Sequence, residues 1–366
     1  MKRGLWLCCC LASLALGQTE GDFLDVSIAV FSHATSADPA AAAPAADGSV
    51  AATVAAVRES EQRLLPLYLR YRLEQSGRFG AVRVLPVLDN GAELRIDGSI
   101  LESTGSRLAL QIRASDSLGR LWVDQTYAGT AIRSESLSDD AFAEDVFAGV
   151  FSALIRDLVA RLEQQDTAAL HRIKNAALVR YGHGLVPAAF EDFMRQQTDG
   201  SFSLERLPAD DDPLLRRILA IREREYLFID VVDEQYQQFY GDVKPVYDLW
   251  RNVQAEQAES SSARTARELA APSAFPRGSY RALQDSYNNF RWAKLQQLYV
   301  EEVGQGFTNE VAPTQLALDD SVYKLSGTLE QQYREWRGLL AELFALETAA
   351  QAGGAASASP GTSAAP

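Results

Sequence analysis

Hydrophobic and polar positions alternate along the first half of the chain, and along the second half the hydrophobic positions recur every three or four residues. The clearest alternation lies in Asp25–Phe31, where every second residue is apolar, and it predicts a β-strand. The same criterion predicts four further strands, over 81–87, 93–101, 107–116 and 121–127. Two other segments have the spacing of amphipathic helices, 49–75 and 139–162.

Short turns separate the later strands, and each turn offers a glycine where a tight hairpin needs a positive φ. The three turns are Asp89-Asn90-Gly91, Ser103-Thr104-Gly105 and Ser117-Leu118-Gly119. The last three strands are therefore expected to form an antiparallel meander, against which the helix over 139–162 packs. Within the helix over 49–75, Pro66 should introduce a kink.

The second half, from about Thr167 to Ala349, has the pattern of a helical bundle. Apolar residues from Ile218 to Val243 predict one long helix, which Pro245 should bend, and a Ser/Ala-rich break is expected from Ser260 to Gly278. Two more amphipathic helices are expected over 280–298 and 329–346, with a small hairpin between them over 315–318 and 322–326.

These patterns predict an α+β protein with a small α/β domain followed by a helical bundle domain that carries one short β-hairpin. The α/β domain should contain a mixed, largely antiparallel sheet. The predicted divisions are a signal peptide over 1–17, the α/β domain over 18–165, the helical domain over 166–348 and a disordered tail over 349–366.

The N-terminus has the three parts of a secretory signal peptide. Lys2 and Arg3 precede a short apolar run, and small residues flank an expected cleavage site before Gln18. All three cysteines of the chain, Cys8, Cys9 and Cys10, lie in this run, which is too short to span a membrane. We expect a periplasmic protein without thiols. Lipidation at Cys10, which would make an outer-membrane lipoprotein, is the weaker alternative, because the residues before Cys10 match a lipoprotein signal poorly.

The first half resembles the small α/β domain of several bacterial envelope proteins. The resemblance lies in the strand pattern of about residues 22–163, including Leu94–Ile100, Arg107–Arg113 and the pair Gly119-Arg120 followed by Trp122. The similar proteins are the Tol-system propeller protein, the curli-secretion lipoprotein and the lipoprotein activators of penicillin-binding proteins. The resemblance implies a non-enzymatic domain that docks onto partner proteins of the envelope, and it implies no catalytic residues.

Charge and composition exclude several classes of site. The net charge is −14, and the loss of two basic residues with the signal would leave about −16, which disfavours nucleic acid as a partner. The acidic runs Ser138-Asp139-Asp140 and Asp210-Asp211-Asp212 precede helical patterns, so we interpret them as helix caps, not metal ligands. No cofactor is predicted.

Catalytic patterns are weak. The chain has three histidines, His33, His171 and His183, and the last lies between two glycines in what we interpret as a helix-ending turn. A glycosidase would need two carboxylates across a cleft, whereas Glu223, Glu225, Asp230 and Asp233 are spread along one helix. We therefore predict no catalytic residue.

Aromatic residues of the helical half are the remaining candidates for an interaction site, because such rings can stack on sugars or pack on a partner. They are Tyr236, Tyr240, Tyr247, Trp250, Trp292 and Trp336, and Tyr287 and Tyr333 are further rings that could stack on sugars. Their helical spacing fits core positions at least as well. The sequence thus favours a non-catalytic periplasmic accessory or scaffold protein that binds envelope proteins, with self-association left open. The alternative is a protein that binds or hydrolyses peptidoglycan or another glycan.

Overall fold

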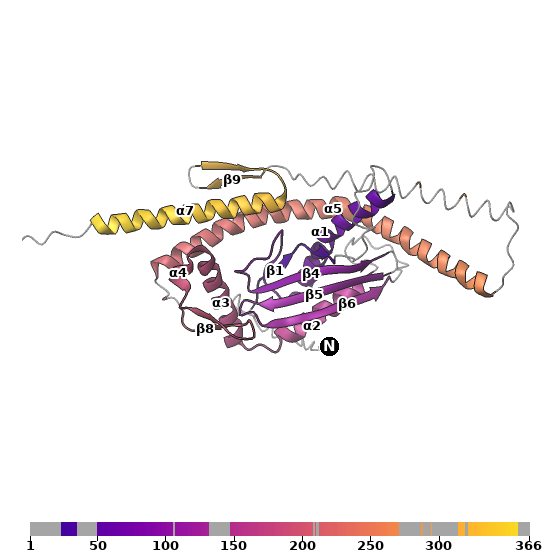
Figure 1. Ribbon diagram of the computed structural model, residues 1–366, viewed down its shortest axis with the longest axis horizontal. Coiled ribbons are helices and arrows are strands. Elements are labelled where there is room, and N and C mark those ends of the chain that lie inside the picture. Colours follow the sequence, from indigo (N-terminus) through magenta and orange to yellow (C-terminus); the bar gives the residue numbers. More distant parts are fainter. Residues whose placement is uncertain are drawn as a thin grey trace, which may run out of the picture.

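The computed structural model describes residues 23–34, 50–104, 107–131, 147–207, 209, 212–270, 287, 294, 314–318 and 321–357. The main sheet comprises β1 (Val26–Ala29), β2 (Ser32–His33), β3 (Val82–Leu85), β4 (Leu94–Ser103), β5 (Arg107–Asp116) and β6 (Leu121–Thr130). The helices are α1 (Val50–Ser76), α2 (Ala148–Leu162), α3 (Thr167–Leu185), α4 (Pro187–Phe190), α5 (Pro213–Ala270) and α7 (Leu329–Ser357). Two hairpins pair β7 (Met194–Gln196) with β8 (Phe202–Leu204) and β9 (Thr314–Leu318) with β10 (Ser321–Leu325). The predicted α+β class is confirmed (Figure 1).

The main sheet is mixed, with the strand order β3-β1-β4-β5-β6, and β2 pairs beside the second half of β4. β1 runs parallel to both β3 and β4, and α1 supplies the crossover that a parallel pair requires. β4, β5 and β6 are antiparallel neighbours, which confirms the predicted meander. Sequence periodicity predicted these strands within a few residues, but it did not indicate which strands are parallel.

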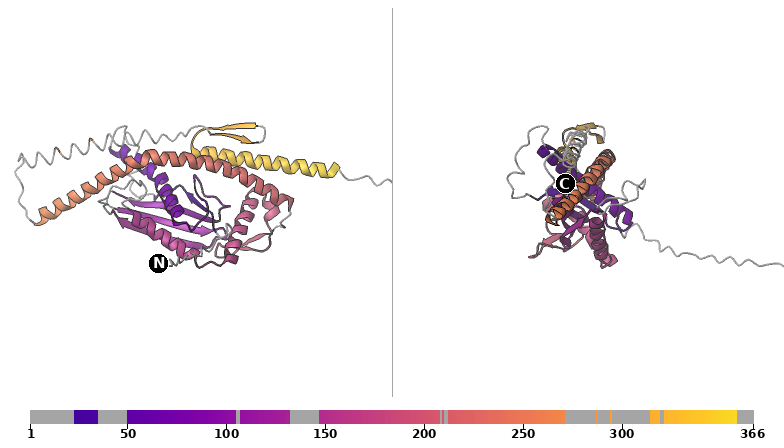
Figure 2. Two further views of the ribbon diagram at one scale, coloured as in Figure 1. Left: turned by 180° about the vertical axis from the view of Figure 1, so that it is seen from behind. Right: turned by 90° about the vertical axis from the view of Figure 1, so that its right-hand side faces the viewer.

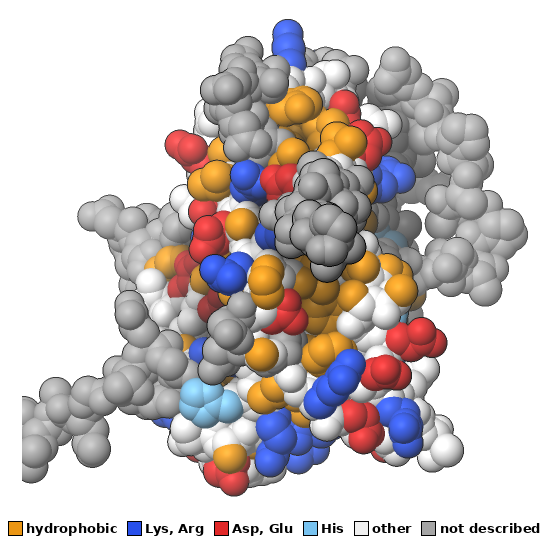
Figure 3. Space-filling model, turned by 90° about the vertical axis from the view of Figure 1, so that its left-hand side faces the viewer, with side chains coloured by type: hydrophobic (Ala, Val, Ile, Leu, Met, Phe, Trp, Pro, Cys, Tyr) orange, Lys and Arg blue, Asp and Glu red, His pale blue; other side chains and the backbone are white. Residues whose placement is uncertain are grey.

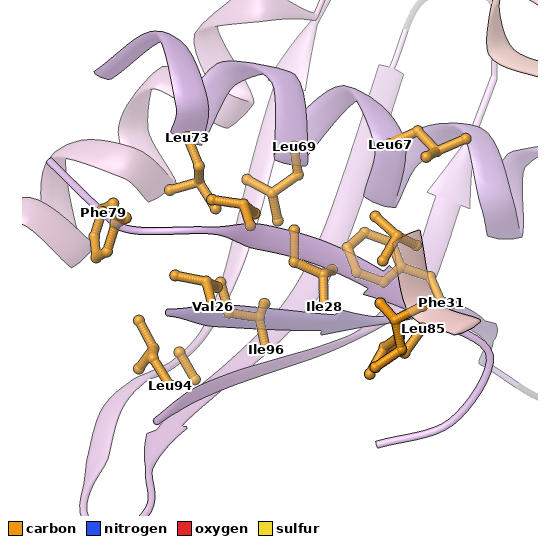
Figure 4. Close-up of a cluster of buried hydrophobic side chains, with 14 of the residues drawn as sticks. Val26, Ile28, Phe31, Leu67, Leu69, Leu73, Phe79, Leu85, Leu94 and Ile96 are labelled. Atoms are coloured by element: carbon orange, nitrogen blue, oxygen red, sulfur yellow. The ribbon is translucent and has the colours of Figure 1, made fainter. Parts of the chain in front are cut away.

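One face of the sheet is covered by α1 and α2, and its apolar side chains form the core of the α/β unit. Figure 4 shows Ile28 of β1 and Ile96 of β4 facing Leu69 and Leu73 of α1, and all four side chains are buried. Tyr68 of α1 packs edge-on against Phe151 of α2, with ring centroids 4.7 Å apart. Burial of these side chains is the main source of stability for this unit.

The opposite face of the β4–β6 region carries polar side chains. Asp97, Arg113 and Asp124 are neighbours across β4, β5 and β6, and a 3.3 Å ion pair joins Arg113 Nη2 to Asp124 Oδ2. Gln111 bridges two residues of β6, donating to Asp124 Oδ1 and accepting from Thr126 Oγ1. Alternation between an apolar and a polar face is the property that made these strands predictable.

The helix α5 lies along the β3 edge of the sheet, contacts α1 and α3, and pairs side by side with α7 (Figures 1 and 2). Phe228 of α5 stacks near both Tyr333 and Trp336 of α7, with ring centroids 5.9 and 6.0 Å apart. Buried residues of the predicted α/β and helical halves belong to one continuous hydrophobic cluster. Because α5 packs along β3, it covers this edge strand, and another chain cannot add a strand there.

Three predictions about the helical half need correction or confirmation. The predicted break at Ser260 is wrong as far as Ala270, because α5 continues through it, and the helix over 329–346 extends to Ser357 instead of giving way to disorder at 349. Alanine, arginine and glutamate favour helix in the first stretch, and alanine and glutamate favour it in the second despite Gly353 and Gly354. The hairpin of β9 and β10 is confirmed. The predicted helix over 280–298, except Tyr287 and Lys294, and the segments 1–22, 132–146 and 358–366 lie outside the described residues.

Figure 3 shows the end of the molecule where α4 and the last turns of α7 lie. Acidic, basic and hydrophobic side chains are interspersed on this face. Leu346 of α7 is 70% exposed and is one of the large hydrophobic side chains that this chain leaves in solvent.

Truncation of a core side chain on α1 tests the packing of the α/β unit. We expect Leu69→Ala to lower the free energy of unfolding by about 2–5 kcal/mol, because it removes buried methyl groups and leaves a cavity. Leu101→Ala on β4 is the matched control: Leu101 is 47% exposed, so its loss should change stability by less than about 0.5 kcal/mol. Urea denaturation followed by circular dichroism measures both, and equal losses would contradict this assignment of the core.

Candidate functional site

The aromatic residues predicted as an interaction site lie mainly in the protein interior. The side chains of Tyr236, Tyr240, Tyr247 and Trp336 are buried, whereas that of Tyr287 is 62% exposed. The side chain of Trp250, and the whole of Trp292, lie outside the described residues. A ring that stacks on a ligand needs an exposed face, so the four buried rings serve helix packing.

The other candidates from the sequence are dispersed. His183 is exposed in the last turn of α3, as the helix-ending interpretation predicted. In the described part of the chain, no three His, Cys, Asp or Glu side chains gather in a way that could hold a metal ion. Asp212 caps α5, since its carboxylate accepts the Leu214 N–H at 2.8 Å. Asp139, Asp140, Asp210 and Asp211 lie outside the described residues.

Charged side chains instead converge where α5 meets the sheet and the loop after β3. A small hollow lies there, and its lining includes five charged residues and one tyrosine: Asp25, Arg83, Asp89, Glu93, Arg222 and Tyr226. We call these residues, together with Arg70, Tyr181, Glu225, Asp233, Tyr333 and Arg337, the α5 joint. Clusters of buried titratable groups are the usual place to look for function, so the joint is the candidate site.

Two arginines bind α5 to the sheet side of the joint. The guanidinium of Arg83, on β3, lies 4.5 Å from the centre of the Tyr226 ring and forms a 3.4 Å ion pair with Asp25. Arg222, on α5, donates from Nε to the Tyr226 hydroxyl at 2.7 Å and from Nη2 to the Gly91 carbonyl at 2.9 Å. The helix is thus attached to a strand and to a loop by directional contacts.

The loop after β3 is shaped for this contact. Asp89 accepts the Gly91 N–H at 2.8 Å, which is a local turn formed by the Asp-Asn-Gly sequence. A β-carbon at Gly91 would come within 2.9 Å of Tyr181 on α3, so only glycine fits between the loop and that helix. The sequence predicted this turn, but it did not predict that the Gly91 carbonyl accepts a hydrogen bond from Arg222.

Two carboxyl groups of the joint have a raised pKa because they are buried. Glu93 accepts the Asp25 N–H at 2.9 Å, yet burial raises the pKa of its carboxyl. Glu225 of α5 accepts the Tyr333 hydroxyl of α7 at 2.8 Å and lies 3.5 Å from Arg337 Nε. Burial raises the pKa of Glu225 as well, despite the nearby Arg337 charge.

A third carboxyl links α5 to α1. Asp233 Oδ1 lies 3.0 Å from Arg70 Nη1, and the pair is close without the alignment of a hydrogen bond. Burial outweighs the attraction of Arg70 and raises the pKa of Asp233 to about 6. Of the four acids considered from the sequence, Glu225 and Asp233 are thus buried, while Glu223 and Asp230 are exposed.

A second polar cluster attaches α5 farther along its length. Arg251 and Glu61 are 2% and 1% exposed, and Arg251 Nη2 lies 2.8 Å from Glu61 Oε1. The same carboxylate oxygen accepts the hydroxyls of Ser103 and Tyr247, at 2.7 and 2.9 Å. Arg251 also donates to the Thr104 carbonyl. We call this the Glu61 cluster; it joins α1, the end of β4 and α5.

Both clusters use their charged groups to hold elements together. Glu93, Glu225, Asp233 and Glu61 each have a donor or cation from another element of the fold. Arg83 contacts the ring of Tyr226 and Arg222 donates to its hydroxyl, and Tyr226 is the aromatic residue that lines the hollow. The geometry therefore fits a fixed attachment of α5 better than a cleft that receives a substrate.

Comparisons with protein-family models, with curated proteins and with solved structures found no match to this chain. None of the helices that the structure describes combines the length and the apolar character that a membrane crossing requires.

The Glu61 cluster can be tested by removing its cation. We expect Arg251→Met to lower the free energy of unfolding by about 3–5 kcal/mol, because it leaves a buried carboxylate without its partner. Adding Glu61→Gln should recover part of that loss, since the remaining group is neutral. Urea denaturation of the single and double variants measures the coupling between the two residues.

An exposed pair on the same sheet provides the control. Arg107 and Glu102 are 2.9 Å apart, and their side chains are 55% and 44% exposed. Arg107→Met should cost less than about 1 kcal/mol. A cost for Arg251→Met as small as that of the control would contradict the structural role of the Glu61 cluster.

Proposed function

We propose that this protein is a non-catalytic accessory or scaffold protein of the bacterial cell envelope, exported by its N-terminal signal peptide. In this proposal, the α/β unit and the long helices are surfaces that bind partner proteins in the periplasm. The strand pattern that resembles docking domains of envelope proteins supports the assignment, as does the use of the buried charges in holding α5.

The length of α5 beyond its attachments carries the proposal. α5 contains 58 residues, and its contacts from Arg222 to Arg251 fix it on the α/β unit. It then continues to Ala270, roughly 28 Å at a rise of about 1.5 Å per residue. Figure 1 shows this part running away from the sheet. We call residues 252–270 the α5 arm. A helix that extends from a firmly attached base is suited to reach a partner.

No observation favours the glycan-directed alternative. The side chains of Tyr236, Tyr240, Tyr247 and Trp336 are buried, and the exposed ring of Tyr287 does not by itself form a platform. The acids beside Tyr226 are engaged with Arg83 and with backbone N–H groups. An interaction role for the α5 arm needs neither an aromatic platform nor free carboxylates.

Site-specific photo-cross-linking in envelope preparations tests the proposal. A photoreactive amino acid would replace Gln257 or Ser261 in the α5 arm, and Ala160, an exposed residue of α2, in the control. We expect both arm positions to cross-link to the same envelope protein, identified by mass spectrometry, and the control position to give no such product.

Two results would overturn the proposal. One is the absence of a product from either arm position while the protein is exported and folded. The other is turnover of an envelope polymer by the purified chain that is lost in Glu93→Gln or His183→Ala, because it would show that these side chains act on a substrate.

A further inference from the structure

The two outer strands of the main sheet differ in what covers them. β3 packs against α5, whereas β6 (Leu121–Thr130) ends the strand order on the other side. Figure 1 shows β6 as the outermost strand beside β5. Among the residues that the structure describes, no strand pairs with the outer side of β6. Backbone N–H and C=O groups on that side can therefore accept a strand from another chain.

β6 lacks most of the features by which edge strands avoid such pairing, which are short length, lysine, proline and a central bulge. It is ten residues long and contains no Lys, Arg or Pro. Its one charged residue, Asp124, is paired with Arg113 at 3.3 Å. The register shift against β5 lies near the start of β6, so the stretch from Val123 to Thr130 is regular. A long, regular strand of this kind is suited to pairing.

Small or uncharged side chains dominate the open face of the sheet at this edge. The alternate residues of β6 that share this face are all exposed, and they are Asp124, Thr126, Ala128 and Thr130. Only one of the four carries a charge. A second strand could thus lie beside β6 without displacing a bulky or cationic side chain.

On the other face, the polar groups of α2 near this edge are already bound to β6. The Asp157 carboxylate accepts from Gln125 Nε2 and from the Tyr127 hydroxyl, both at 2.8 Å. Arg161 donates from Nε to the Trp122 carbonyl at 3.3 Å, at the start of the strand. These contacts engage the acid and the arginine of α2 that lie closest to β6, so neither needs a partner from another chain.

The sequence of β6 is compatible with a second copy of itself. In an antiparallel pair centred on Thr126, each Thr126 lies opposite its counterpart, and each Asp124 lies opposite Ala128 of the second copy. Threonine pairs across strands are favourable, and the two carboxylates do not face each other. A pair centred on Asp124 would place like charges directly opposite, which is unfavourable. The single charge of the strand thus selects among the possible registers.

We propose that two copies of this chain associate by antiparallel pairing of β6 with β6, with Thr126 on the two-fold axis. Such a contact uses the same surface of both copies, so it closes the open edge of each sheet. Because α5 covers β3, no second edge of the main sheet is left for a third copy, and the assembly stops at a dimer. The measurements below use the purified chain alone, so their outcome does not depend on the cross-linking result.

Opposite charges at the two-fold axis test the proposal. In Thr126→Lys, two lysines would face each other, and in Thr126→Glu, two glutamates. We expect sedimentation equilibrium to show a dimer for the parent chain and a dimer weakened by about fivefold or more for each variant. An equimolar mixture of the two variants should recover the dimer, because Lys then faces Glu. Leu101→Lys is the matched control: it adds the same charge at a position 47% exposed on β4, and the dimer should keep its strength.

A distance measurement tests the register without changing Thr126. A spin label would be attached at Thr130→Cys, an exposed position, with Cys8, Cys9 and Cys10 replaced by serine. Thr130 lies four positions beyond Thr126, so the two labelled positions of a dimer are eight positions apart along the paired strands. At about 3.4 Å per residue, this separation is about 27 Å.

Three results would overturn the inference. The first is a parent chain that stays monomeric, including one that pairs its β6 edge only with an extended peptide of another protein. The second is a dimer whose strength is the same in the folded Thr126 variants as in the Leu101→Lys control. The third is a labelled dimer without the expected distance, and this measurement decides the matter if the Thr126 variants fail to fold.

Discussion

Burial of charged side chains along α5 is the constraint on which the arrangement of this molecule depends. A helix can carry ionic groups into an interior only where each one meets a hydrogen-bond partner or an opposite charge. Arg222, Glu225, Asp233 and Arg251 lie on the side of α5 that faces the rest of the protein, and each has such a partner. Because the partners belong to different elements, these contacts fix one position and one rotation of the helix against the α/β unit.

Apolar and polar contacts have different tasks in this arrangement. The side chains between the sheet and α1 and α2, and those between Phe228 and the rings of α7, supply the favourable free energy of burial, which depends little on direction. A slip of α5 by one turn would preserve much of that apolar contact. It would separate Arg251 from Glu61 and Arg222 from the Gly91 carbonyl, leaving buried groups unpaired. The polar clusters therefore fix the position of α5 along the α/β unit more than they add to the net stability of the fold.

The parts of this fold that the sequence predicts are those whose signal is local. Alternation marked β4, β5 and β6, and glycine turns joined them, because each pattern depends on neighbouring residues. The joint escaped prediction because its contacts are distant in sequence: Arg222 and Gly91 are 131 residues apart, and Arg251 and Glu61 are 190 apart. A usable signal did exist, since Glu225 and Asp233 interrupt the apolar side of a helix, where a charged residue usually implies a buried partner. The aromatic residues were ambiguous because rings at helical spacing suit a core and a binding face equally.

The continuity of α5 follows from the same physics. Starting a helix is costly, whereas extending it adds one hydrogen bond for each residue fixed. The segment from Arg222 to Arg251 is held by tertiary contacts, so the residues that follow only need to propagate an existing helix. The Ser/Ala-rich stretch after Ser260 resembles a break when it is judged by itself, but as an extension it contains enough alanine, arginine and glutamate to continue to Ala270. The α5 arm therefore owes its helical form to the contacts that precede it, the α5 joint and the Glu61 cluster. Loss of those contacts would remove the fixed helix from which the arm extends.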